Sequence, residues 1–170
     1  MDAATATTGT GPSGLVLRIC TAWAVLGGLV LLAVVTVNVV SVAGAALFNA
    51  AVPGDFELTE IGVAIAAFSF LPYCQIAGLN VTADIFTARA SKFWLSLFSL
   101  AGSLVALIFG VILLWRMYHG MLDQRTYDST TAILQIPLWW GYAPCLISLA
   151  LLALASLASL VDATRDILRG

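Results

Sequence analysis

The sequence is poor in the side chains on which catalysis and metal binding depend. It holds a single histidine, His119, three cysteines that form no CxxC pair, and only 9% charged residues, against about 25% in soluble domains. One histidine cannot supply both ligands of a bis-histidine haem, and isolated cysteines do not make a zinc site. The sequence also has no GxSxG or HExxH motif. We therefore expect that the chain is not an enzyme and binds no metal or cofactor.

Basic residues are equally scarce. The seven lysines and arginines stand in ones and twos and are outnumbered by nine acidic residues, so the formal net charge is -2. Nucleic-acid binding needs a basic patch or stripe, and this pattern excludes it. The cysteines lie within apolar sequence, and we expect each to act as a small packing side chain: Cys20, Cys74 and Cys145.

Apolar residues take the place of the missing charge. They make up 61% of the chain, and the mean hydropathy is +1.03, which is typical of an integral membrane protein. A transmembrane helix needs about 20 mostly apolar residues. We expect a flexible tail over residues 1–14, unlike a signal peptide because it has no basic region, and one all-α membrane domain over residues 15–170. Its four expected spans are residues 19–48, 61–83, 93–116 and 133–161.

The positions of the basic residues predict the orientation of the four spans. Lysine and arginine accumulate on the cytoplasmic side of a membrane protein. Five of them fall on the side that holds both termini: Arg18, Arg89, Lys92, Arg165 and Arg169. Only Arg116 and Arg125 fall on the other side. We therefore expect both termini in the cytoplasm, an acidic first outer loop, and a longer second outer loop of mixed sign.

The polar stretch between the second and third expected spans contains Asp84, Arg89 and Lys92. Asp84 falls about one turn beyond the membrane boundary that a second span starting near Ile61 would reach. This position avoids the cost of about 2.5 to 3.5 kcal/mol for a carboxylate at the centre of a transmembrane helix. We expect a short interfacial helix at the cytoplasmic surface, with Asp84 at its N-cap or in its first turn.

Small residues and prolines mark the expected packing surfaces and irregularities. Gly102, Ala106 and Gly110 recur every four residues, so they share one face of the third span and allow another helix to come close. Their partner is either a helix of this chain or another protein. A proline removes an N–H donor from a helix, and we expect local bends or breaks at three of them: Pro72, Pro137 and Pro144.

The expected spans carry no charged residue in their middle. Ion and substrate pathways normally place ionisable side chains deep in the bilayer. The deepest strongly polar groups include Asn38 and Gln75, which we expect to form hydrogen bonds between helices. The pattern favours a scaffold for another membrane protein. The alternative is a stand-alone homo-oligomeric four-helix channel or small multidrug-type exporter with Glu60 as its coupling carboxylate.

Three stretches, in a fixed order, carry a family resemblance. "ELTEIGVAI" opens the second span, "GLNVTADIF" follows it, and "YDSTTAILQIPLWWGYAP" leads into the fourth. Over about residues 26–161 the chain resembles the small, Q-type membrane subunit of tripartite ATP-independent periplasmic (TRAP) transporters. The matching positions are Glu60, Gly78, Asp84, Ser129, Pro137, Trp139, Tyr142 and Pro144. Asn80 stands where the family has a histidine, and Gln75 where an arginine is common.

The resemblance implies a transporter of several components in the cytoplasmic (inner) membrane of a bacterium or archaeon. A periplasmic substrate-binding protein delivers an organic anion, often a carboxylate, to a large multi-span permease that couples uptake to sodium or protons. The small subunit braces the permease within the lipid and helps to form the surface on which the binding protein docks. It holds no substrate site or cofactor of its own.

Topology then indicates two candidate interfaces. The outer loops offer a docking edge for the binding protein, formed by Asp55, Glu57, Arg125 and Ser129. The face of Gly102, Ala106 and Gly110 is the candidate contact with the large permease.

Overall fold

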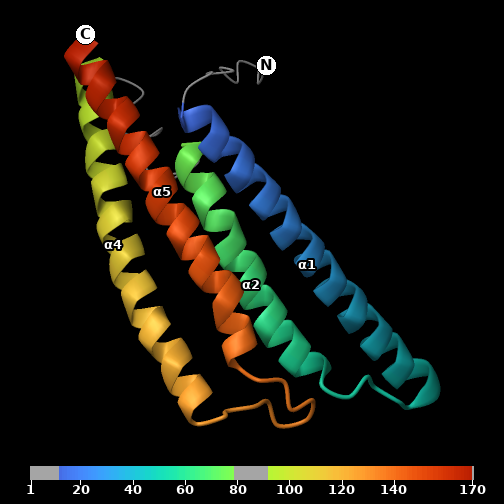
Figure 1. The fold of residues 1–170 in the computed structure, drawn as a ribbon. Coiled ribbons are helices and arrows are strands. Elements are labelled where there is room, and N and C mark those ends of the chain that lie inside the picture. The colour runs from blue at the N-terminus through green and yellow to red at the C-terminus, as the bar shows by residue number, and fades with distance from the viewer. Residues whose placement is uncertain (1–11, 79–91, 170) are drawn as a thin grey trace.

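The computed structural model describes residues 12–78 and 92–169, and this part of the chain is helical (Figure 1). Its four helices are α1 (Pro12–Phe48), α2 (Asp55–Ile76), α4 (Lys92–Thr126) and α5 (Trp139–Arg169). The described residues contain no strand beyond an isolated bridge, and all four helices are long and apolar enough to cross a membrane. The protein is thus an all-helical, multi-pass membrane protein. The expected interfacial helix, with Asn80 and Asp84, lies outside the described residues.

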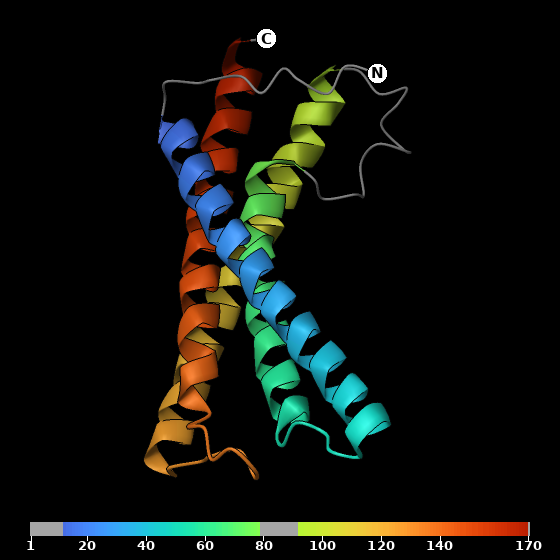
Figure 2. The same cartoon turned by 90° about the vertical axis from the view of Figure 1, so that its right-hand side faces the viewer.

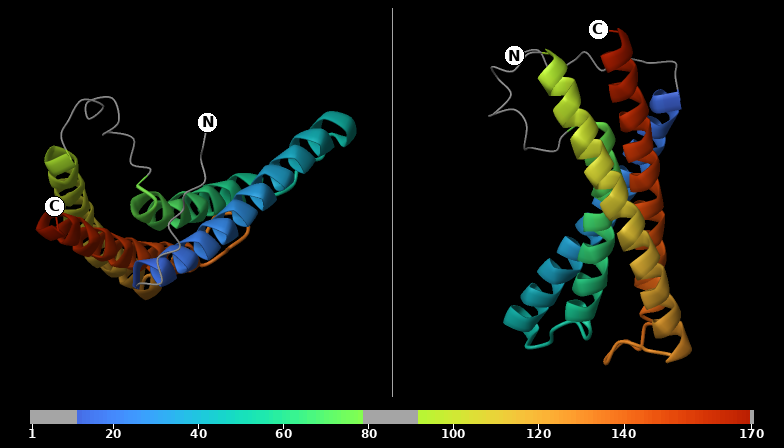
Figure 3. Two further views of the ribbon diagram at one scale, coloured as in Figure 1. Left: turned by 90° about the horizontal axis from the view of Figure 1, so that it is seen from above. Right: turned by 90° about the vertical axis from the view of Figure 1, so that its left-hand side faces the viewer.

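The helices form an open, bent row rather than a closed bundle. α4 packs on α5, α5 on α2, and α2 on α1, while α1 touches α5 less extensively. Seen from above, the α4–α5 pair and the α1–α2 pair form two arms (Figure 3), and α1 crosses α2 obliquely (Figure 2). Along the direction of the helices, the start of α1 and the end of α5 lie at the same end of the molecule (Figure 1). We call the opposite end, where the α1–α2 and α4–α5 loops lie, the loop end.

α2 begins at Asp55, before the start of the expected second span. Gly54 precedes it with φ 77, a left-handed conformation that glycine adopts without steric cost. Asp55 and Glu57 stand in the first turn, where negative charge complements the helix dipole. The helix ends at Ile76 because Gly78 adopts φ 65, and the Ala77 and Gly78 N–H groups donate to carbonyls of the last turn.

The fourth helix starts later than the expected fourth span. Residues 133–138 were expected within that span, but they belong to the loop before α5. The reason is local: Pro137 has no N–H to donate, and the Ile133 and Leu134 N–H groups bond to a side chain of α2 instead of to their own helix. α4, by contrast, continues past Arg116 to Thr126.

The two prolines within helices do not end them. Pro72 lies inside α2 and Pro144 inside α5, and both helices continue through these positions. Of the expected bends or breaks, the break does not occur there, and a local bend stays a prediction. The carbonyl of Pro144 accepts a hydrogen bond from the Ser148 hydroxyl at 2.8 Å. Pro137 lies outside α5 and pairs with Thr130 in the isolated bridge.

Small side chains make the closest contacts between helices. A Cβ atom added to Gly27 of α1 would lie 2.5 Å from the Ser69 Cβ of α2, and one added to Gly62 would overlap the Val34 side chain. Two of the cysteines, Cys20 and Cys145, are buried, Cys74 is half-buried, and all three are free thiols. The prediction that the cysteines act as packing residues is confirmed for the two buried ones.

Candidate functional site

Polar side chains fasten α1 to α2 near the loop end. The Asn38 amide of α1 donates to the Thr59 hydroxyl of α2 at 2.7 Å, which confirms the predicted interhelical role of Asn38. One turn further along α1, the buried Ser41 hydroxyl donates to the Asp55 carboxylate and accepts the Val52 N–H at 3.2 Å. These bonds tie the end of α1, the connecting loop and the start of α2 into one unit.

The α4–α5 loop contains a small hairpin, residues 129–138, which we call the loop hairpin. The Leu138 N–H donates to the Ser129 carbonyl at 3.0 Å, and the Thr131 N–H donates to the Ile136 carbonyl at 3.0 Å. The Thr131 hydroxyl accepts the Ile136 N–H at 3.0 Å. Gln135 turns the tip with φ 53. These bonds join the two arms of the hairpin. The N–H groups of residues 133 and 134, at its tip, donate to a side chain outside the hairpin.

The side chain of Glu57 receives those two N–H groups. Its two carboxylate oxygens accept the Ile133 N–H at 2.7 Å and the Leu134 N–H at 2.9 Å, and the residue is only 8% exposed. Charge-assisted bonds of this kind are stronger than neutral ones, and a buried carboxylate requires them. The side chain of Leu134 also packs against Gly54, where an added Cβ would overlap it. Glu57 therefore connects the α4–α5 loop to the start of α2.

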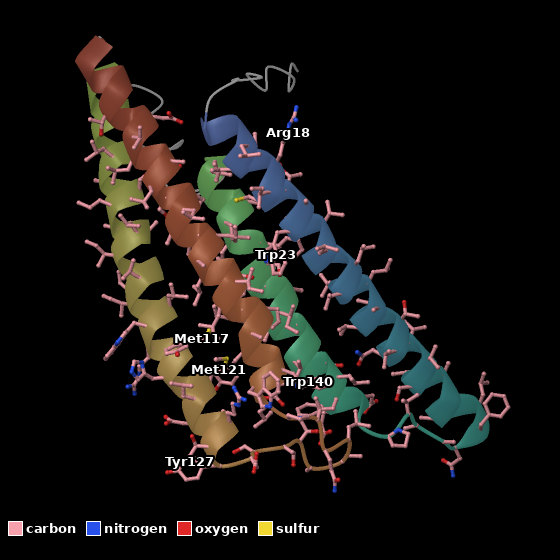
Figure 4. The ribbon with its side chains drawn as sticks, in the orientation of Figure 1. Arg18, Trp23, Met117, Met121, Tyr127 and Trp140 are labelled. Carbon is pink, nitrogen blue, oxygen red and sulfur yellow. The ribbon has the colours of Figure 1, made fainter. Side chains whose placement is uncertain are left out.

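Three further contacts position α5. The Trp23 indole N–H of α1 donates to the Ser148 hydroxyl of α5 at 2.8 Å (Trp23 is labelled in Figure 4). At the loop end, the Arg125 guanidinium of α4 lies 5.8 Å from the centre of the Trp139 ring. A Cβ added to Gly120 of α4 would lie 3.4 Å from the Tyr142 ring, so that ring packs closely on α4.

The docking-edge candidates from the sequence all lie at the loop end, but they differ in accessibility. Asp55 bonds to Ser41 and to the Phe56 N–H, and Glu57 is turned inward onto the hairpin. Arg125 is exposed, and Ser129 is half-buried at the base of the hairpin. A soluble partner can therefore touch Arg125 directly, whereas Glu57 is already engaged within the chain.

The three small residues of α4 do not face one neighbour. Gly110 is buried against Leu152 and Ala153 of α5, Ala106 is half-buried, and Gly102 meets open space. α5 thus covers one end of this stripe. The permease contact on the other end stays a prediction.

The other described residues that match the family motifs either are exposed or have a structural role. Glu60 is exposed on the second turn of α2, and Gly78 caps the other end of that helix. Pro137 closes the loop hairpin, and Trp139 begins α5 beneath Arg125. The described residues hold no group of three or more metal-ligating side chains. His119 is exposed, and its Nδ1 pairs with the Trp115 carbonyl at 2.9 Å.

Sequence reasoning missed the partners in these contacts. Ser41 and Ser148 were not singled out, and no contact was predicted for Trp23, because a serine or tryptophan in an apolar helix gives no sign of where it points. Gly54 followed by two acidic residues was a usable signal for a helix start. No signal identified Leu134 as the residue that packs on Gly54.

Taken together, these features define a multi-pass membrane protein whose polar side chains fasten its own helices and loops. Residues 31–166 match the family described as tripartite ATP-independent periplasmic transporters, DctQ component. The match covers most of the chain, so the protein belongs to the DctQ family, the small component of TRAP transporters, and the resemblance seen in the sequence is confirmed. No curated protein and no solved structure matches the chain. The family is one of transporter components that work with partners, and it is not a family of enzymes.

Proposed function

We propose that this chain is the scaffold and docking subunit of a TRAP transporter that imports an organic anion, most often a carboxylate. Its partners are a large multi-span permease, coupled to sodium or protons, and a periplasmic substrate-binding protein. The complex resides in the cytoplasmic membrane of a bacterium or archaeon, with both termini of this chain in the cytoplasm. On this proposal the loop end faces the periplasm.

The open row of helices is the observation that carries the proposal. α4 has α5 as its main neighbour in the chain, and α1 has α2, so both present wide apolar faces. Lipid alone can cover such faces, but so can the helices of a larger permease. The acidic side chains of α2 lie within its first two turns, away from mid-helix, which supports a subunit that braces rather than translocates.

The stand-alone alternative gains no support from Glu60. A coupling carboxylate works inside a water-filled cavity within the membrane. Glu60 is instead an exposed residue near the loop end of α2. We therefore retain the scaffold role as the single proposed function.

Reconstitution of the separate components tests the proposal. Proteoliposomes would contain the large permease with or without this chain, and the binding protein loaded with a radiolabelled carboxylate would be added outside. We expect uptake only when all three proteins are present, and co-purification of this chain with the permease. Full uptake without this chain would overturn the proposal. Transport by this chain alone, abolished by Glu60→Gln, would establish the alternative.

A further inference from the structure

The loop hairpin lacks the means to hold its own position. Within the described residues it has one isolated bridge and a few backbone bonds, and two-stranded hairpins of this size are marginally stable in isolation. Its tip side chain Ile133 is 61% exposed, so apolar burial fixes that residue only in part. Its orientation therefore depends on contacts with another element.

Glu57 of α2 supplies one such contact. It accepts two successive N–H groups at the hairpin tip, and the bonds to Ile133 and Leu134 span 76 and 77 residues of sequence. The donors come from consecutive residues, an arrangement that forms an anion-binding nest in backbone structure. Here the anion is a side chain of the same protein.

The start of α2, from which Glu57 projects, is itself held in place. Ser41 of α1 donates a hydrogen bond to Asp55, and Asn38 of α1 donates one to Thr59, two residues to either side of Glu57. Leu134 adds a second contact by packing on Gly54. The position of the hairpin is therefore fixed relative to α1 and α2 as well as to its own helices, α4 and α5.

We propose that Glu57 is a positioning residue, which holds the loop hairpin in the orientation that contacts the periplasmic substrate-binding protein. This inference rests on the proposed function. The exposed residues around the tip and base of the hairpin would form the contact: Tyr127, Asp128, Thr130 and Ile133. Glu57 itself does not touch the partner. Its removal frees the hairpin, and docking then has to order it again at the cost of affinity.

Glu57→Gln tests the proposal, with Glu60→Gln as the matched control. A glutamine is uncharged, and a donor NH₂ group replaces one of the two accepting oxygens, so at least one of the two N–H groups loses its charged acceptor. Uptake would be measured in proteoliposomes holding the complete membrane complex, at increasing concentrations of binding protein. We expect the half-saturating concentration to rise about tenfold for Glu57→Gln, the size of effect of losing one bond to a charged group, with the maximal rate within about twofold of wild type. Glu60→Gln should change neither value.

Amide hydrogen exchange separates positioning from general damage. In Glu57→Gln we expect faster exchange at Ile133 and Leu134, with unchanged exchange in the middle of α2 and α5. Faster exchange at the hairpin with an unchanged half-saturating concentration would overturn the proposal, and so would unchanged exchange.

A second variant covers the case in which Glu57→Gln fails to assemble. Leu134→Ala removes the packing on Gly54 but keeps the carboxylate and its hydrogen bonds, and we expect a smaller rise in the half-saturating concentration. No rise would overturn the positioning role. Failure of the proposed function looks different, because wild-type uptake would then require neither this chain nor the binding protein.

Discussion

The inner helices α2 and α5 and the outer helices α1 and α4 are held in different ways. In their most apolar stretches, 28% of the residues of α2 and 33% of those of α5 are buried, but only 11% of those of α1 and of α4. The outer helices leave large side chains uncovered, such as Leu32 and Phe109, at 62% and 61% exposure. In water this exposure would be costly. In lipid it is not, because the acyl chains are as apolar as leucine.

The difference shows what keeps an outer helix in place. Without a hydrophobic force between helices, association depends on close packing and hydrogen bonds. α1 has both. Gly27 of α1 and Gly62 of α2 let these two helices pack closely, and Asn38 and Trp23 of α1 donate hydrogen bonds to α2 and α5. α4 is attached to α5 by the packing of Gly110 on that helix and by the ring contacts near the loop end. A few residues therefore carry most of the attachment of each outer helix.

The largest effect should come from filling the closest contact between an outer and an inner helix. Gly27→Ala places a Cβ 2.5 Å from the Ser69 Cβ, a carbon that cannot rotate away. We expect the free energy of unfolding in detergent micelles to fall by roughly 1 to 3 kcal/mol, as for other overpacked sites. The adjacent Gly28→Ala is the control, because an added Cβ there meets nothing within 4 Å. Equal effects of the two substitutions would contradict a packing contact at Gly27.

The next prediction compares two glycines of α4, Gly110 and Gly102. Gly110→Val brings bulk toward Leu152 and the α5 backbone, and we expect a loss of about 1 to 2 kcal/mol in unfolding free energy. Gly102→Val meets open space and should leave the isolated chain unchanged. If the permease packs there, Gly102→Val will instead reduce recovery of the permease in a pull-down with the tagged chain. Normal recovery would remove Gly102 from the permease contact.

A smaller effect is expected for the hydrogen bond that joins α1 to α5. Trp23→Phe and Ser148→Ala each remove one partner of the 2.8 Å bond. A double-mutant cycle on the unfolding free energy in micelles should give a coupling of about 0.6 kcal/mol and at most about 1.7, the range for such bonds within membrane proteins. Zero coupling would mean that the two side chains act independently, and that this hydrogen bond does not hold α1 on α5.

The sequence was sufficient for the helices but not for their neighbours. Charge-free windows of suitable length predicted four helices because the bilayer imposes both length and apolarity on every span. The same uniform apolarity hides which face of a helix is covered. Gly102, Ala106 and Gly110 were correctly placed on α4, yet the stripe alone did not reveal that α5 covers only one end of it.

The loop end was harder to predict for a different reason. Glu57 was selected as a charged residue of an outer loop and therefore as a candidate contact for a soluble partner. Its actual partners are backbone N–H groups of Ile133 and Leu134, and a backbone donor has no signature in the sequence. Residues 133–138 were placed in the fourth span, but they lie before α5, partly for the same reason: the Ile133 and Leu134 N–H groups donate to Glu57, a side chain distant in sequence.

The smallest expected effect concerns how the end of α4 is fixed to the start of α5. Arg125 lies over Trp139 with 5.8 Å between the guanidinium carbon and the ring centre. Arg125→Gln should lower the unfolding free energy by about 0.5 kcal/mol, the lower end of the range for an exposed cation–π contact, because the separation is close to the limit of about 6 Å for such contacts. Arg116→Gln is the matched control, because Arg116 is an exposed arginine of the same helix for which the described residues provide no such ring. In a Trp139→Leu background the effect of Arg125→Gln should vanish. A loss that persists there would mean that Arg125 stabilises the end of α4 through the helix dipole rather than through the ring.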